Sequence, residues 1–316
     1  MREIGGYIEL DTYHLPMLHE NAIALNCGRN CLAYLFKSRR IKKLKVSYFI
    51  CNSIFNVCER EGVDKTYYHI TKSFRPEDNL TLADDEWLYL VNLYGQLSNE
   101  EIREYVDKYS RVIVDQANGY FVEPLSGVDT FYTCRKWFGV ADGAFLYTDN
   151  ILQDEFPVDE SFDRMRFLLG RYERTASEFY ADYNANNRFF VNEPIKRMSK
   201  LTHNFLHAID YTFVQERRKE NFAYLHHELK ENNLLKLKPG LFMYPLMIGN
   251  GDEIRKKLQS EKIYIPTLWP TVFEVTSPDD LEYQMAKNIL PLPIDQRYEI
   301  QDMKYLVERI KKLLEV

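Results

Sequence analysis

The sequence predicts an α/β fold, with a large domain built on a mostly parallel, mixed sheet and a smaller α/β domain after it. Strand-like apolar runs alternate with helix-like segments between residues 46 and 147, a pattern typical of parallel sheets. Polar residues stand at or just after the ends of several runs, where parallel sheets bind ligands. A second alternation begins at Pro239-Gly240. We expect a large domain over residues 1–205, and a connecting helix with the small C-terminal domain over residues 206–316.

The first half of the chain contains the stronger element signals. A short strand or ribbon is expected at 5–10, behind two glycines. Apolar residues at helical spacing predict helices from Gly28, over 54–61 and over 98–109, the last with Ser98 and Glu101 as a capping box. Apolar runs predict strands at 46–50, 66–70, 87–93, 111–115, from 128 onward and at 144–147.

The second half is expected to be more helical. An amphipathic helix is predicted over 162–183, an asparagine-rich loop over 182–192 and a long helical stretch over 198–231. The C-terminal unit is expected to contain a strand at 241–248, a helix at 252–261, a strand at 263–265 and a terminal helix at 302–314.

Composition narrows the class of protein. The 316 residues are 45% hydrophobic and 28% charged, which is typical of a globular chain with a large core. A net charge of -6 argues against nucleic-acid binding. No apolar run approaches the length of a membrane span, and the N-terminus lacks the apolar region of a signal peptide. Because five cysteines do not suggest a disulfide framework, we expect a cytoplasmic protein without a membrane partner.

Lys136 is the first candidate catalytic residue. It lies between Arg135 and Trp137, at the polar end of a strand-like run. Aromatic neighbours and a second cation would favour the neutral amine, which attacks carbonyl groups. The alternative is an ordinary lysine whose ammonium reaches solvent from a strand end.

Asp115 and the helix that begins at Gly28 complete a candidate site. Asp115 ends a strand and could hold a ring nitrogen of an aromatic cofactor protonated. The free N–H groups of the helix, with Arg29 and Asn30 in its first turn, could bind a phosphate. Together with a lysine that holds an aldehyde, these features meet the requirements of pyridoxal phosphate. The alternatives are helix capping by Asp115 and Asn30, and coincidence of the three features.

Metal binding is not expected. Cys27 and Cys31 lie one helical turn apart without a second pair of soft ligands nearby, so we interpret them as small core or pocket residues. His203 and His207 are also one turn apart, but no third ligand is evident, and the same holds for the pair His226-His227.

Several motifs, in order along most of the chain, resemble the DegT/DnrJ/StrS-type sugar aminotransferases, and in particular a shorter branch of them. Their order and spacing agree with the family. The segment from Cys27 to Leu32 is similar to the family's Ser-Gly-Thr-x-Ala-Leu phosphate turn, and the segment from Asn92 to Gln96 is similar to its His-Leu-Tyr-Gly-Gln. The segment from Val112 to Ala117 is similar to its V-I-E-D-x-A, and Thr133 to Lys136 with Asp142-Gly143 is similar to its Ser-x-Arg-Lys…Asp-Gly-Gly. The segments from Leu268 to Pro270 and from Leu292 to Tyr298 are also similar to family segments.

The resemblance implies a fold type I, aspartate aminotransferase-like enzyme that uses pyridoxal 5'-phosphate. Lys136 would hold the cofactor as a Schiff base and move the proton, and Asp115 would pair with the pyridine nitrogen. The remaining implied cofactor contacts are Gly28, Arg29, Asn30, Cys51, Asn92, Asn118 and Thr133. The family often has an aromatic residue where Cys51 stands, a threonine where Arg29 stands and a histidine where Asn92 stands.

The resemblance also implies an activity and an assembly. The expected reaction moves an amino group from glutamate to a keto group on a nucleotide-linked sugar. A homodimer is implied, with active sites at the subunit boundary, and the loop at 182–192 is the best candidate to cross it. The alternative is a family member with altered catalysis and a binding or regulatory role. A nicotinamide-dependent enzyme is disfavoured because no G-x-G-x-x-G follows an early strand.

Overall fold

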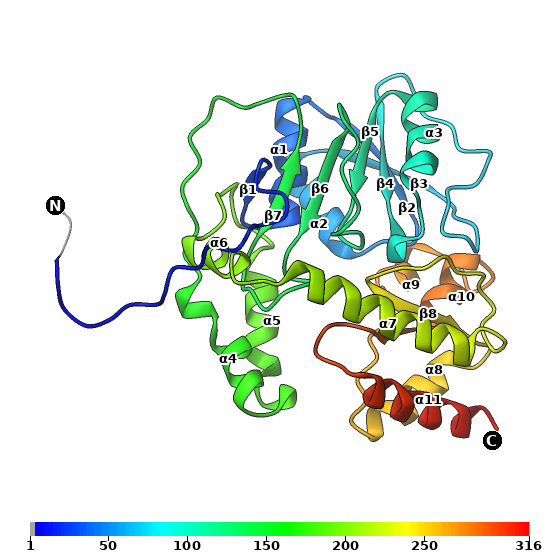
Figure 1. The fold of residues 1–316 in the computed structure, drawn as a ribbon. Helices are drawn as coiled ribbons and strands as arrows, with labels where there is room; N and C mark the ends of the chain where they lie inside the picture. Colours follow the sequence, from blue (N-terminus) through cyan, green and yellow to red (C-terminus); the bar gives the residue numbers. More distant parts are fainter. Residues whose placement is uncertain (1–3, 316) are drawn as a thin grey trace.

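A seven-stranded mixed sheet forms the centre of the protein, whose structure is a computed structural model describing residues 4–315 (Figure 1). The strand order is β1-β7-β6-β5-β4-β2-β3. The pairs β2–β3, β2–β4, β4–β5 and β5–β6 are parallel, whereas β1–β7 and β6–β7 are antiparallel. The strands are β1 (Ile23–Leu25), β2 (Lys43–Ser47), β3 (Asp64–Tyr68), β4 (Glu86–Val91), β5 (Val112–Asp115), β6 (Asp129–Thr133) and β7 (Ala144–Tyr147).

Three helices follow strands of the large sheet. Helix α1 (Gly28–Ser38) lies against β6 and β7, next to α2 (Asn52–Glu61), which ends at Gly62 in the left-handed conformation. Helix α3 (Asn99–Tyr109) lies by β5 and has the predicted capping box, since Ser98 and Glu101 exchange hydrogen bonds. The predicted α/β alternation is therefore confirmed.

A two-stranded antiparallel sheet organises the C-terminal part of the chain. Strands β8 (Met243–Met247) and β9 (Ile289–Pro293) pair along their full length, beside a second hydrophobic core. The helices here are α7 (Tyr211–Leu229), α8 (Gly251–Ser260), α9 (Val272–Val275), α10 (Leu281–Asn288) and α11 (Ile300–Leu314). The predicted small α/β unit is present, while the domain boundary at residues 205 and 206 stays a prediction.

The region between the two sheets differs most from the sequence prediction. The helix expected over 162–183 is broken into η2 (Phe162–Arg164), α4 (Arg166–Glu173), η3 (Ala176–Phe179) and α5 (Tyr180–Phe189). The loop expected over 182–192 is wrong, because most of it lies in α5. Asn186 contributes to the difference. Its side-chain amide donates to the carbonyl of Ala141 at 2.9 Å and fixes α5 to the loop before β7. The stretch expected over 198–231 is two helices, α6 (Lys200–Leu206) and α7.

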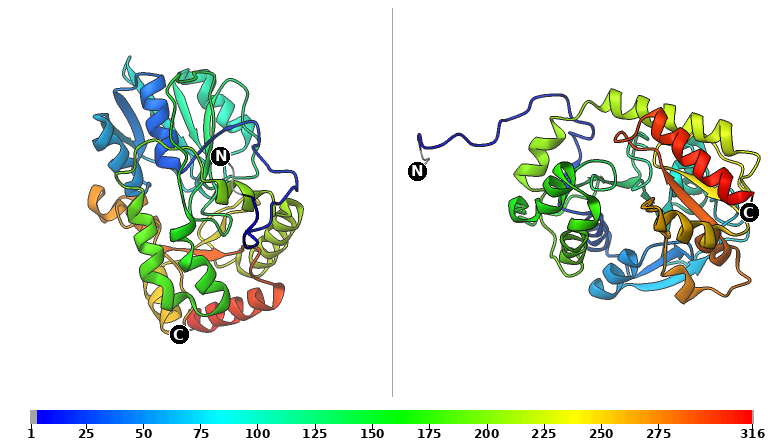
Figure 2. Two further views of the ribbon diagram at one scale, coloured as in Figure 1. Left: turned by 90° about the vertical axis from the view of Figure 1, so that its left-hand side faces the viewer. Right: turned by 90° about the horizontal axis from the view of Figure 1, so that it is seen from below.

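Two predicted strands are absent from the part of the chain that the structure describes. Residues 263–265 have no partner strand, and Ile265 is buried by the small core instead. Residues 5–10 are unpaired and exposed, with Tyr7 96% exposed, in a segment that projects from the body (Figures 1 and 2). Conversely, β1, β9 and α10 were not predicted.

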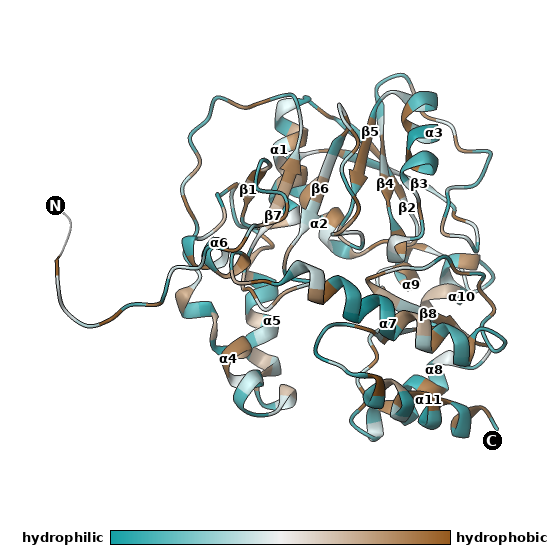
Figure 3. Ribbon diagram, in the orientation of Figure 1, coloured by the Kyte–Doolittle hydropathy of each residue, from teal (hydrophilic) through white to brown (hydrophobic). Residues whose placement is uncertain are grey.

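Hydrophobic residues gather in the large sheet. Figure 3 shows them along β5 and β7, while the middle of α7 is hydrophilic, as expected for a helix with one side in solvent. Across residues 4–315, no helix combines the length and apolarity that a membrane crossing would require.

Candidate functional site

The predicted site residues come together at the carboxyl edge of the parallel strands. Asp115 is the last residue of β5, and Lys136 follows the end of β6 by three residues. Cys51 lies between β2 and α2, and Gly28 opens α1. Because neighbouring parallel strands end at the same edge, four separate elements present these residues to one region.

Lys136 has an exposed side chain at this edge. Its ammonium lies 5.7 Å from the centre of the Phe242 ring, which belongs to the segment that leads into β8. The next residue, Trp137, is buried, and its indole N–H donates to the carbonyl of Ala117 at 3.0 Å. Lys136 therefore lies between a segment of the large sheet and the segment that leads into the small one.

Asp115 is a buried carboxylate, only 8% exposed. The hydroxyl of Tyr89 donates to its Oδ2 at 2.6 Å, and the backbone N–H of Ala117 donates to its Oδ1 at 2.7 Å. Burial raises the pKa of Asp115, and the positive charge of Lys136 is the largest effect that opposes the rise. The two predicted catalytic groups are thus close enough to interact electrostatically.

The first turn of α1 lies unusually close to β6. A Cβ atom on Gly28 would be 2.8 Å from Cγ2 of Thr133 and 3.3 Å from the Phe131 ring, so only glycine fits here without a shift. Cys27 precedes the helix and its side chain gives no capping hydrogen bond. The N–H groups of a helix's first turn have no partner within the helix, so this end is available to an anion.

Unpaired polar atoms surround this helix end. Within residues 4–315, Oγ1 of Thr133, Nε of Arg29 and Nε of Arg135 are buried without a hydrogen-bond partner. Buried donors without partners are rare and costly. Two guanidinium groups, a hydroxyl and a helix N-terminus are together the donor set that a phosphate group requires. The residues present therefore fit the phosphate of the expected cofactor.

Arg135 is a site residue that the sequence analysis did not select. Its guanidinium lies over the Phe190 ring at 4.8 Å and donates to Oδ1 of Asn187 in α5. Burial lowers its pKa to about 10. Its position directly before Lys136 was the available signal.

Four other predicted contacts have their polar atoms engaged within the protein. The buried amide of Asn30 donates to Asn26 and to the carbonyl of Pro194, at 2.8 and 2.7 Å. The side-chain amide of Asn92 binds the backbone of Leu97 twice. Its Nδ2 donates to the Leu97 carbonyl at 3.1 Å, and its Oδ1 accepts the Leu97 N–H at 2.8 Å.

The remaining two are Asn118 and Cys51. Oδ1 of Asn118 accepts the N–H of Tyr94 at 3.3 Å. The half-buried Cys51 thiol lies 2.6 Å from the Ser53 hydroxyl. Asn30 and Asn92 are buried and hydrogen-bonded within the protein, and direct cofactor contact by any of the four stays a prediction.

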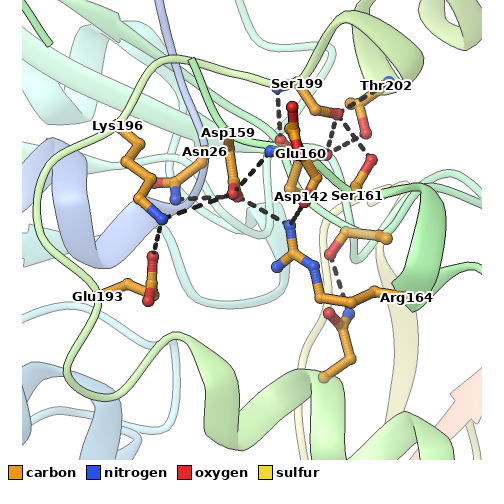
Figure 4. Close-up of polar contacts among 12 residues, drawn as sticks. Asn26, Asp142, Asp159, Glu160, Ser161, Arg164, Glu193, Lys196, Ser199 and Thr202 are labelled. Atoms are coloured by element: carbon orange, nitrogen blue, oxygen red, sulfur yellow. Dashed lines mark hydrogen bonds and ion pairs between the residues drawn. The ribbon is translucent and has the colours of Figure 1, made fainter. Parts of the chain in front are cut away.

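A polar network fixes the chain after Lys136 (Figure 4). Asp142, fully buried, accepts hydrogen bonds from the N–H and hydroxyl of Ser199, both at 2.7 Å, and from the Thr202 hydroxyl. Burial raises the pKa of Asp142. The network connects the loop that carries Lys136 to the start of α6.

A second buried carboxylate in Figure 4, Asp159, connects to Asn26, two residues before the start of α1. Asn26 donates to Asp159 at 3.1 Å, and Arg164 donates to it at 2.9 Å. The carbonyl of Asn26 accepts the N–H of Gly143 at 2.6 Å. Asn26 thus joins the N-terminal end of α1 to the Lys136 loop, and sequence patterns gave no signal for it.

The paired histidines do not extend into a metal site. The rings of His203 and His207 lie 5.0 Å apart. Throughout the described residues, no group of three histidine, cysteine or acidic side chains could hold a metal ion. Cys27 and Cys31 are buried free thiols, as predicted.

Comparison with solved structures gives consistent likenesses, although no protein-family model and no curated protein sequence matches the chain. DesV from S. venezuelae, solved in complex with a ketimine intermediate, is 14% identical with a TM-score of 0.65, over 93% of this chain and 85% of DesV. NtdA from Bacillus subtilis, solved with bound cofactor PMP, is 13% identical with a TM-score of 0.67, over 93% of this chain and 73% of NtdA.

A third solved structure carries the name of the family that the motifs resemble. The DegT DnrJ EryC1 StrS aminotransferase from Brucella abortus is 15% identical with a TM-score of 0.59, over 92% of this chain and 85% of that one. These likenesses, with the seven-stranded mixed sheet, confirm the predicted fold class. The chain therefore has the fold of the pyridoxal phosphate-dependent aminotransferases.

Proposed function

We propose that the protein is a pyridoxal phosphate-dependent aminotransferase of the DegT/DnrJ/StrS type. The observation that carries the proposal is the convergence of three features on one sheet edge. These are the exposed amine of Lys136, the buried carboxylate of Asp115, and the unpaired donors around the first turn of α1. Lysine, carboxylate and phosphate site are the three protein contributions that this cofactor needs.

Each residue has a proposed task. Gly28, Arg29, Thr133 and Arg135 hold the phosphate at α1. Asp115 keeps the pyridine nitrogen protonated, so that the bound cofactor can act as an electron sink. Lys136 would hold the aldehyde carbon of the cofactor. Once the amino group of the donor displaces it, its free amine would move the proton between substrate and cofactor as general acid and base.

The proposed substrates follow from the resemblance and from the solved structures of sugar aminotransferases. Glutamate donates its amino group and leaves as 2-oxoglutarate. A keto group, on a nucleotide-linked sugar, receives the nitrogen and becomes an amine. NtdA is described with PMP bound, the form of the cofactor that carries the amino group.

A second candidate function is cofactor or ligand binding without turnover. The hydroxyl of Tyr89 donates to Oδ2 of Asp115 at 2.6 Å, so the carboxylate already has a partner from within the protein. Cys51 and Asn92 also differ from the usual family residues. Turnover decides between the two functions.

We also propose a cytoplasmic homodimer. Large apolar side chains are exposed around α4, with Tyr172 94% and Phe162 72% exposed. Such exposure is typical of a surface that a second copy covers. All five cysteines are free, as expected in a reducing compartment. Light scattering tests the dimer, and a monomeric mass at micromolar concentration would contradict it.

Absorbance spectroscopy tests the central assignment. Purified protein is titrated with pyridoxal phosphate beside Lys136→Ala and Lys200→Ala, the latter an exposed lysine at the start of α6. We expect a visible band in the native protein and in Lys200→Ala but not in Lys136→Ala. Glutamate should then convert the bound cofactor to its amine form. A band without conversion by any amino donor would favour the binding function, and no band would refute the aminotransferase function.

A further inference from the structure

Arg218 of α7 is a fully buried arginine, 1% exposed, between the two sheets. Its Nη1 donates to the carbonyls of Leu241 at 2.8 Å and Phe242 at 3.3 Å. Its Nη2 donates to the carbonyl of Trp137 at 3.4 Å, and its Nε donates to the Gln296 amide oxygen at 3.0 Å. One side chain therefore joins three segments that are distant in sequence.

Two of these segments flank Lys136. Trp137 is the next residue in the chain, and the guanidinium of Arg218 also lies over its ring at 4.5 Å. Phe242 presents its ring to the Lys136 ammonium from the opposite segment, at 5.7 Å. Arg218 thus holds both the backbone beside Lys136 and the residue that its amine faces.

Gln296 strengthens the same contact. Its Nε2 donates to the carbonyl of Trp137 at 2.8 Å, while its Oε1 accepts from Arg218. The Trp137 carbonyl therefore receives two donors from the C-terminal part of the chain. Such a closed set of hydrogen bonds fixes a backbone more firmly than a single bond.

The charge of Arg218 has no direct counterion. No carboxylate within residues 4–315 lies within 4.0 Å of its guanidinium, and Asp295 is bound to Arg297 instead. Burial lowers the pKa of Arg218 to about 10, with the charge of Asp295 opposing the fall. Burying a cation without an ion pair is costly, and an apolar side chain would fill this space at a lower cost.

We infer that Arg218 is a positioning residue for Lys136, which holds the Trp137 carbonyl and the Phe242 segment in one fixed arrangement. The planar guanidinium is suited to this task, because its donors point in fixed, divergent directions and reach three acceptors at once. A lysine keeps the charge but offers no rigid fork. The role in catalysis rests on the proposed function, whereas the hold on the Lys136 segment does not.

Hydrogen exchange of the cofactor-free protein tests the hold directly. The N–H groups of Trp137 and Phe138 donate to the carbonyl of Cys134, both at 2.9 Å, in the turn that carries Lys136. In Arg218→Met we expect these two amides to exchange at least tenfold faster, because the turn loses its anchor. Arg218→Lys should give an intermediate rate. Arg217→Met is the matched control on the same helix, since Arg217 lies by Glu220 near the surface, and it should leave both amides unchanged.

The linkage of the cofactor provides the second readout. After incubation with pyridoxal phosphate and gel filtration, bound cofactor is measured with and without borohydride reduction. In Arg218→Met the phosphate site is intact, so cofactor should remain bound while the fraction fixed to Lys136 falls at least threefold. A merely structural role would reduce binding and fixation together.

The outcomes separate the inference from the proposed function. Unchanged exchange of the Trp137 and Phe138 amides in Arg218→Met would overturn the inference, whatever the cofactor does. If the native protein fixes no cofactor, the proposed function fails, and the exchange rates still decide whether Arg218 holds the turn. Should Arg218→Met lack the native circular dichroism spectrum, Arg218→Lys decides, and native-like exchange in that variant would overturn the inference.

Discussion

Replacing Asp142 with alanine removes the acceptor at the centre of the network that follows Lys136. The carboxylate is fully buried and receives the N–H and hydroxyl of Ser199 and the hydroxyl of Thr202. Asp142→Ala would leave the Ser199 N–H without a partner, because α6 begins there and offers no other acceptor. The Ser199 hydroxyl can turn to Ser161, 2.8 Å away, so its loss is smaller.

The expected cost follows from these three contacts. A hydrogen bond to a charged acceptor contributes about 1.5–3 kcal/mol, and an unsatisfied buried donor costs about 1–3 kcal/mol. Burial raises the pKa of Asp142, because the charged carboxylate is less stable there than in water. Removing this buried charge therefore offsets part of the free energy lost with the hydrogen bonds. We therefore expect Asp142→Ala to lower the free energy of unfolding by about 3 kcal/mol.

Urea denaturation followed by circular dichroism measures this change. Asp154→Ala is the matched control, since Asp154 pairs with Lys37 at 2.8 Å at the surface, with side chains 44% and 50% exposed. Exposed pairs contribute about 1 kcal/mol or less, so the control midpoint should barely move. Equal midpoints for the two variants would refute the view that Asp142 anchors the Lys136 loop.

Three further predictions concern pH, packing and thiol chemistry. Burial lowers the pKa of His19 to about 4 from 6.5, so the unfolded state takes up the proton first, and stability should fall by about 3 kcal/mol from pH 6.5 to pH 4. His19→Gln should show a correspondingly weaker pH dependence of unfolding; parallel curves for both proteins would contradict this. Gly28→Ala should lose about 1–3 kcal/mol and bind pyridoxal phosphate more weakly, because its Cβ would meet Thr133 at 2.8 Å. Gly249→Ala, with open space around the Cβ, is the control, and equal effects would argue against the close packing at α1. Finally, Cys51 alone should react rapidly with a thiol reagent at pH 8, since the other four thiols are buried and burial raises the pKa of Cys58 to about 12. A rapid phase that survives in Cys51→Ser would be the contrary result.

Local patterns predicted the sheet of the large domain well. The apolar runs ending at Asp115 and near Thr133 are strands that neighbours bury on both faces, so their sequence alone indicates their structure. Glycine at position 28 and the capping box at Ser98 are likewise local signals, and both mark helix starts.

Elements that depend on distant partners were predicted poorly. Strand β9 contains Pro291 and Pro293, and proline weakens a strand prediction because it lacks a backbone N–H donor. In the two-stranded sheet β9 is an edge strand beside β8, and edge strands tolerate proline. Residues 263–265 have strand-like composition but pair with no strand among residues 4–315. The asparagine-rich composition of residues 182–192 indicates a loop. The segment is mostly helical because contacts with distant residues stabilise it, such as the hydrogen bond from the Asn186 side chain to the Ala141 carbonyl, and local sequence does not reveal such contacts.

The candidate site also contains residues that local sequence indicates and residues that only distant contacts reveal. The sequence indicates Lys136 and Asp115 as candidates because each stands at or just after a strand end, and the structure places both there, while their roles stay a prediction. Arg218 is not indicated by the sequence, because its hydrogen bond to the Trp137 carbonyl joins residues 81 positions apart along the chain. The Asp142 network joins residues 57 positions apart, and no local pattern indicates such a contact.

Identifying which lysine becomes fixed to the cofactor tests the central claim most directly. The protein is incubated with pyridoxal phosphate, reduced with borohydride, digested and mapped by peptide mass spectrometry. We predict that the added mass lies on Lys136 in the peptide around Trp137 and Phe138, at about one per chain. Modification spread over several surface lysines, or concentrated on another residue, would contradict the account.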